Sequence, residues 1–137
     1  MQIFLLALAV ATISVAAAAA DQKCRPSDVP SILAQVRQAE DRGEFLGRYG
    51  TPERCFAAWG ERLRRRRTDA GQHLACVTRQ TVTGSVHIDL KALDFNAADA
   101  LCLRINVCLF DLFDRGDNDP ANRSLAQAWD RLSCMGH

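Results

Sequence analysis

The chain has 137 residues, of which 48% are hydrophobic and 24% are charged, and its formal net charge at pH 7 is +1. A chain of this length can bury one hydrophobic core and suits a single folded domain. The near balance of acidic and basic residues excludes a strongly basic protein that binds nucleic acid and an acidic, disordered chain.

Residues 1–20 have the composition of a secretory signal peptide. They contain no Asp, Glu, Lys or Arg, are almost wholly apolar and end in a run of alanines. The small residues Ala18 and Ala20 after an apolar stretch predict cleavage after Ala20. An uncleaved anchor helix is the alternative, but a stretch so rich in Ala is weakly hydrophobic for an anchor. We expect a secreted, extracellular protein whose mature form, residues 21–137, is one domain with no stable membrane insertion.

All six cysteines fall within the expected mature chain. An even number of cysteines in a small exported chain predicts a disulfide framework, with reduced core cysteines as the alternative. We expect three disulfides, formed by Cys24, Cys55, Cys76, Cys102, Cys108 and Cys134.

The first predicted helix has a capping residue at its start and a glycine at its end. Ser27 or Asp28 can cap it, and apolar residues then recur at helical spacing as far as Gly43. Gly43, Gly47 and Gly50 mark an irregular turn after it.

A second helix is predicted to begin at Thr51-Pro52-Glu53, where a capping hydroxyl precedes a proline and a carboxylate. It ends in the basic run Arg64–Arg67, and a third helix is predicted from Asp69 to about Gly84. Ser85 to Leu90 alternates apolar and polar residues, which is the period of a strand. Because no partner strand is predicted, we interpret this stretch as an extended connector.

The most apolar part of the mature chain predicts a central helix, Ala97 to Arg115, because its few polar residues fall within one sector. Asp119-Pro120 begins a last helix that carries Leu125 and Trp129 inward. We therefore predict an all-α fold, a small disulfide-stapled bundle of about five helices around the central apolar helix 97–115. Cys102 and Cys108 would lie about 9 Å apart along that helix, beyond the reach of a disulfide, so each should bond to a different neighbour.

Arg115, Gly116 and Asp117 form the tripeptide of adhesion ligands, in which the guanidinium and the carboxylate stand on opposite sides of a glycine turn. This motif predicts binding to an integrin-type receptor. In the alternative interpretation Gly116 ends one helix and Asp119 caps the next.

The basic run of Arg64, Arg65, Arg66 and Arg67 is a candidate processing site, as in a hormone-like precursor. Two alternatives are a solvated helix end and a patch that binds an anionic surface.

Asn122 begins an N-glycosylation sequon. His73, His87 and His137 are isolated, and none has a His partner at the spacing of a helical metal site, so we expect no metal and no cofactor. His73 is expected to be an exposed helix residue. No catalytic constellation or phosphate-binding loop is present, and we expect a protein that is not an enzyme.

The aromatic residues could line a cavity for a small lipophilic ligand, although most are expected to be core. The candidate wall residues are Phe56, Trp59, Phe95, Phe110, Phe113 and Trp129.

Six cysteines on helices resemble the pattern of insect odorant-binding proteins, but the close-set middle pair is absent because Cys55 and Cys76 lie far apart. The spacing of Cys102, Cys108 and Cys134 is similar to the C-terminal part of microplusin-type antimicrobial proteins, which are His-rich copper binders. This chain has three scattered His. Neither likeness therefore carries a residue or an activity over to it.

The leading functional hypothesis is a secreted, non-enzymatic effector that binds an extracellular or cell-surface protein, as toxins, defence proteins and antagonists do. Two alternatives are an extracellular carrier of a small lipophilic ligand and a hormone-like precursor.

Overall fold

The computed structural model describes residues 23–65 and 72–135. In chain order the elements are η1 (Pro26–Asp28), α2 (Val29–Arg42), β1 (Glu44–Tyr49), α3 (Pro52–Arg65), β2 (Gln72–Gln80), β3 (Val86–Asp94), α4 (Phe95–Asp111), η2 (Phe113–Arg115) and α5 (Pro120–Arg131). The predicted signal peptide, residues 1–20, lies outside the described residues. None of the helices in the described part is long and apolar enough to cross a membrane.

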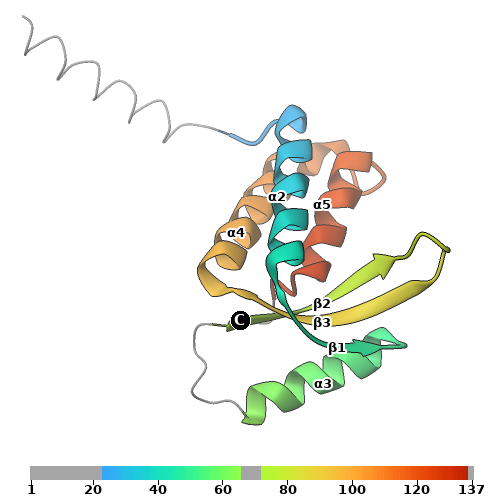
Figure 1. Cartoon of the computed structure of the whole chain (residues 1–137). Coiled ribbons are helices and arrows are strands. Elements are labelled where there is room, and N and C mark those ends of the chain that lie inside the picture. Colours follow the sequence, from blue (N-terminus) through green and yellow to red (C-terminus); the bar gives the residue numbers. More distant parts are fainter. Residues whose placement is uncertain (1–22, 66–71, 136–137) are drawn as a thin grey trace, which may run out of the picture.

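The strands form one antiparallel sheet in the order β1-β3-β2, so β3 is central and β1 and β2 are its edges. Figure 1 shows α2, α4 and α5 packed on one face of the sheet and α3 on the other. The larger core cluster lies between the sheet and the three helices, and includes the fully buried Ile32, Ile105 and Leu125. A smaller cluster, which includes Cys55 and Leu90, lies between the sheet and α3.

The prediction of an all-α bundle is wrong, because the chain contains this three-stranded sheet. Of the helix predicted from Asp69 to Gly84, the described residues form β2 and the turn after it, and residues 86–90 of the predicted connector belong to β3. Helices cover both faces of β2, so residues 73–77 are all buried and the strand loses its alternating pattern. The irregular turn predicted around Gly47 is β1.

The hairpin partner of the alternating stretch is therefore β2, which pairs with β3 along its nine residues without a register shift. The turn between the strands places Gly84 at a φ of 87°, and its N–H donates to the Thr81 carbonyl. Glycine adopts a positive φ without a steric penalty, and here that conformation closes the hairpin.

The prediction of three disulfides is confirmed, and the bonds join Cys24 to Cys108, Cys55 to Cys76, and Cys102 to Cys134. As predicted, Cys102 and Cys108 on α4 bond to two different neighbours. One neighbour is the segment before α2 and the other is the segment after α5. Three disulfides indicate an extracellular or otherwise oxidising environment, which is compatible with secretion.

Candidate functional site

An open groove of about 610 Å³ lies beside β2, one of the two edge strands of the sheet. Since α3 and α5 cover opposite faces of the sheet (Figure 1), they form the two walls of the groove, and the sheet forms its floor. The residues that line it include Phe56, Trp59, Cys76, Thr78, Ile88, Trp129 and Met135. Its volume lies within the range of protein pockets that bind ligands.

Both tryptophans of the chain stand on these walls, Trp59 on α3 and Trp129 on α5. The ring centroid of Phe56 lies 6.0 Å from that of Trp59, and Phe56 is 45% exposed. Met135, which also lines the groove, is 83% exposed. Large apolar side chains left exposed around a groove are typical of a binding surface, because a ligand can bury them.

Two disulfides hold the walls in place. The Cys55–Cys76 bond ties α3 to β2, and the Cys102–Cys134 bond ties the segment after α5 to α4. Because the walls are fixed by covalent bonds, the groove is preformed, and a ligand that enters it has little protein structure to order.

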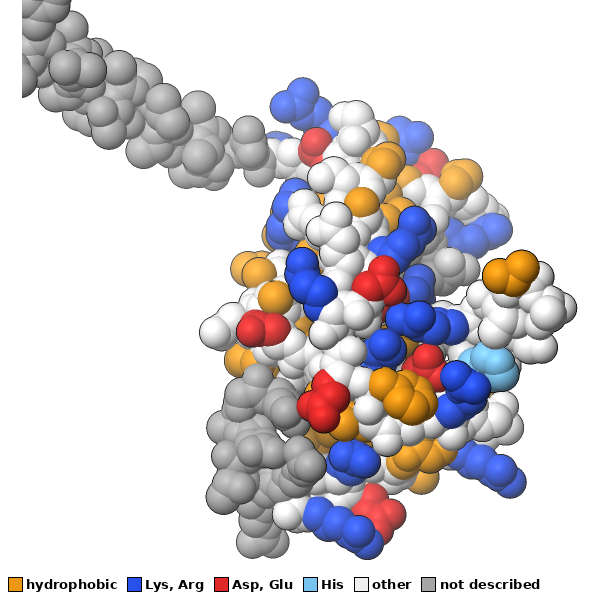
Figure 2. Space-filling view, viewed as in Figure 1, with side chains coloured by type: hydrophobic (Ala, Val, Ile, Leu, Met, Phe, Trp, Pro, Cys, Tyr) orange, Lys and Arg blue, Asp and Glu red, His pale blue; other side chains and the backbone are white. Residues whose placement is uncertain are grey.

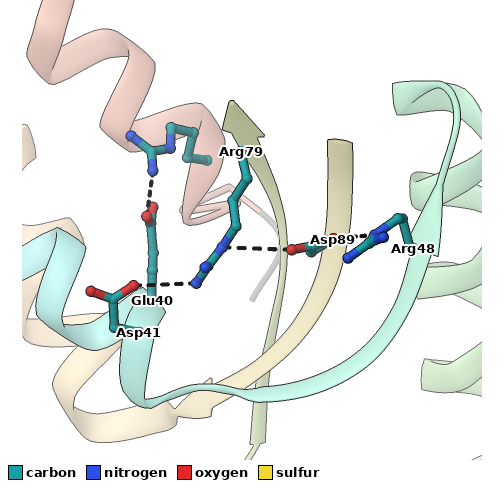
Figure 3. A network of polar contacts seen from close by, with 6 residues as sticks. Glu40, Asp41, Arg48, Arg79 and Asp89 are labelled. Atoms are coloured by element: carbon teal, nitrogen blue, oxygen red, sulfur yellow. Dashed lines mark hydrogen bonds and ion pairs between the residues drawn. The ribbon is translucent and has the colours of Figure 1, made fainter. Parts of the chain in front are cut away.

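A network of ion pairs joins α2, α5 and all three strands near one wall of the groove (Figure 3). It joins Arg79 to Asp41 and Asp89 at 3.2 Å and 3.5 Å, Arg48 to Asp89 at 3.6 Å, and Arg131 to Glu40.

Glu40 is the most buried member of this network, with 2% of its surface exposed. Desolvation raises the pKa of its carboxyl group above the ordinary value, because burial outweighs the attraction of Arg131. Arg131 itself lines the groove. The network therefore fixes the end of α5, which carries one groove wall, relative to α2 and the sheet.

The predicted adhesion tripeptide lies in η2 and the loop before α5, with Arg115, Gly116 and Asp117 all exposed. The Arg115 Nε lies 3.2 Å from Asp119 Oδ1, and Asp119 also accepts hydrogen bonds from two backbone N–H groups in the first turn of α5. Desolvation opposes ionisation of Asp119, but these hydrogen bonds outweigh it and lower the pKa of its carboxyl group. The geometry agrees with the helix-capping interpretation of these residues, and receptor binding stays a prediction.

The structure describes two of the four arginines in the predicted processing run. Arg64 and Arg65 are exposed at the end of α3, and Arg65 pairs with Glu61 at 2.7 Å, whereas Arg66 and Arg67 lie outside the described residues. On the face seen in Figure 2, Lys and Arg side chains are interspersed with Asp and Glu. This face therefore presents no uniform positive field. Cleavage at the run stays a prediction.

Asn122 is 7% exposed in the first turn of α5. Its Nδ2 donates hydrogen bonds to the carbonyl groups of Leu112 at 2.8 Å and Gly116 at 3.0 Å. This nitrogen is the atom to which an N-glycan is attached. Glycosylation at Asn122 stays a prediction, and it would have to precede the folding of this loop.

His73 is not an exposed helix residue as predicted. It lies on β2 with 3% of its surface exposed, and its Nε2 makes a hydrogen bond with the Leu132 carbonyl. His87 lies on β3, and His137 is outside the described residues. In the part of the chain that the structure describes, no cluster of three or more His, Cys, Asp or Glu side chains could hold a metal ion.

The structure brings together half of the aromatic residues that were candidate cavity walls. Phe56, Trp59 and Trp129 line the groove. Phe110 and Phe113 are 81% and 76% exposed and do not line it, and Phe95 lies beside His73 with ring centroids 6.5 Å apart.

Three features of the site were not predicted: the sheet edge, the contribution of Met135, and the ion pairs. The alternation of residues 85–90 was the one signal of a sheet. The function has to be inferred from the chemistry of the groove, since no protein-family model, curated protein or solved structure matches the chain.

Proposed function

We propose that the protein is a secreted, non-enzymatic effector that binds an apolar segment of another protein in the groove beside β2. The observation that carries this proposal is a preformed groove lined by the exposed side chains of Phe56 and Met135 and by two partly buried tryptophans, Trp59 and Trp129. The apolar residues 1–20 and the three disulfides support export to an oxidising compartment.

A protein partner suits this groove because its walls present large, rigid side chains around an open surface. Trp and other aromatic residues dominate the energy of many protein interfaces, since each buries a large apolar area at a low entropic cost. The alternative surface, Arg115–Asp117, offers less, because the Arg115 side chain is engaged by Asp119.

The experiment selects peptides from a phage library of random short sequences against the oxidised mature protein, and measures the affinity of the synthetic winners. Because both tryptophans stand on the groove walls, intrinsic tryptophan emission reports binding there. Phe56→Ala should weaken the winning peptides by about tenfold, as for an interface anchor. Phe110→Ala is the matched control, since Phe110 is exposed and does not line the groove.

The proposal is supported if the winners share an apolar core and respond to Phe56→Ala only. It is rejected if no sequence is enriched, or if Phe56→Ala and Phe110→Ala have equal effects.

A carrier of a small lipophilic ligand is the second candidate, because Phe56, Trp59 and Trp129 line one groove as that hypothesis requires. A fluorescent fatty acid replaces the peptide in the same titration. Stoichiometric binding that Phe56→Ala weakens, together with a lipid that remains bound through purification, would favour the carrier over the protein binder.

A further inference from the structure

We infer that the partner segment binds as an additional strand on β2, in an extended conformation and through backbone hydrogen bonds. This inference rests on the proposed function, and it adds the binding mode and the class of ligand. It follows from the backbone of β2, from the contrast with the other sheet edge, and from the two walls.

The backbone pairing of β2 leaves every second residue directed away from the sheet. At the end of the hairpin the Thr81 N–H donates to the Ser85 carbonyl at 2.8 Å, and the same register runs through the whole β2–β3 pair. In an antiparallel pair, residues that exchange hydrogen bonds alternate with residues whose N–H and C=O point outward. The odd-numbered residues of β2 therefore bond to β3, and Leu74, Cys76 and Thr78 direct their backbone groups away from the sheet.

No hydrogen bond among the described residues satisfies these outward backbone groups. Cys76 and Thr78 also line the groove floor. An edge strand with unpaired donors and acceptors is a template for another extended chain.

The two edges of the sheet differ in how they are protected. β1 has six residues, contains Gly47, and shifts register between Phe45 and Gly47. Such a bulge twists an edge away from pairing. β2 has nine residues, contains no proline and pairs without a shift. The regular, unprotected edge is the one beside the aromatic groove.

The two walls define which segment fits. Successive side chains of a strand point to opposite faces, so one side chain of an added strand would meet Phe56 and Trp59 on α3, and the next would meet Trp129 on α5. A strand covered on both faces needs a continuous apolar run and not an alternating one. The ligand class is therefore an extended run of roughly four to six apolar residues, the usual length of a short strand.

A second copy of the chain fits less well than a single strand. If the β2 strands of two copies paired directly, each copy would bring its own α3 wall and α5 wall. The two α3 walls would then meet on one face of the joined sheet, and the two α5 walls on the other. A single extended segment needs only the space between the walls.

The test uses a synthetic peptide selected against the oxidised mature protein, with its backbone amides methylated one at a time. Strand addition predicts that methylation weakens binding by about tenfold at every second residue and much less at the residues between, because only alternate N–H groups face β2. A uniform response along the peptide, or a β2-mediated dimer detected by light scattering in place of a peptide complex, overturns the inference.

A protein variant gives an independent readout. Thr78→Pro removes one outward N–H without removing a β2–β3 hydrogen bond, and Thr78→Val keeps that N–H with a side chain of similar shape. Once circular dichroism shows that both variants fold, Thr78→Pro should bind the peptide about tenfold more weakly than Thr78→Val. Equal affinities contradict strand addition. If peptides bind in the groove but N-methylation does not weaken them, strand addition is rejected and the proposed function stands. If no peptide can be selected, the proposed function is rejected as well.

Discussion

Replacing Asn122 by alanine should destabilise the protein, although in the sequence the residue looks like a glycan acceptor. Its Nδ2 supplies the hydrogen bonds to the carbonyl groups of Leu112, at 2.8 Å, and Gly116, at 3.0 Å. Asn122→Ala leaves both carbonyl groups without this donor. Each lost bond costs about 1 kcal/mol. No desolvation cost is added, because the Leu112 carbonyl still accepts from the Arg115 N–H at 3.0 Å and the Gly116 carbonyl from the Asp119 N–H at 3.2 Å.

The expected loss in the free energy of unfolding is about 2 kcal/mol, the sum for the two lost bonds. Alanine also removes Asn122 Oδ1, but this oxygen is buried without a hydrogen-bond partner, so no further bond is lost. For a domain of this size, the loss corresponds to a fall in Tm of roughly 8 °C.

The assay is urea unfolding of the oxidised protein, made without glycosylation so that a glycan cannot contribute. Asn106→Ala is the matched control, since Asn106 is exposed on α4, and it should change stability by less than about 0.5 kcal/mol. Ser124→Ala removes the sequon and keeps Asn122, so it should resemble the wild type. If Asn122→Ala and Asn106→Ala unfold at the same urea concentration, the stabilising role of the two Asn122 hydrogen bonds is wrong.

Two further predictions concern the ion-pair network and the processing run. Desolvation raises the pKa of Glu40 in the folded state, so its contribution to stability is fully present below its ordinary pKa and is lost as pH rises through the raised value. The free energy of unfolding of Glu40→Gln should therefore decline less steeply than that of the wild type above about pH 4.5. Parallel curves of this free energy against pH for the two proteins would exclude the contribution of Glu40. The intact mass of the secreted protein should correspond to a chain that begins at Asp21 and carries three disulfides. Cleavage within Arg64–Arg67 would add one water yet leave the pieces joined, because Cys55–Cys76 and Cys24–Cys108 span the run, so the mass after reduction decides whether the chain is cut.

The helix starts could be predicted from the sequence because a few adjacent residues determine them. Thr51 accepts a hydrogen bond from the Arg54 N–H at 3.3 Å, and Asp119 accepts two from the first turn of α5. The separation of Cys102 and Cys108 could also be predicted, since it depends only on the rise per residue of one helix.

The sheet could not be predicted in the same way, because its pattern depends on what covers it. α3 and the three-helix layer bury β2 from opposite faces, so the apolar run around Cys76 resembles a buried helix. Gly47 within β1, with Gly43 and Gly50 on either side of it, suggests a turn, and only the pairing with β3 makes β1 a strand.

The candidate site was predicted in part. Phe56, Trp59 and Trp129 were candidate wall residues, but an edge strand cannot be located before the strand itself is recognised. The ion pair between Glu40 and Arg131 joins residues 91 positions apart, and no local signal in either segment indicates its partner.

The two disulfides on α4 have a mechanical consequence. Cys24 lies at the start of the described chain and Cys134 near its end, and both are bonded to α4, through Cys108 and Cys102. A force applied between the two ends would therefore pass through two disulfide bonds and the short stretch of α4 between Cys102 and Cys108. The sheet lies outside that path, and so do the groove residues on α3 and β2; of the groove lining, Cys134 and Met135 lie where the force enters. A partner that pulls on the protein, or a surface to which either end is tethered, would load α4 and leave the α3 wall and the β2 edge unstretched.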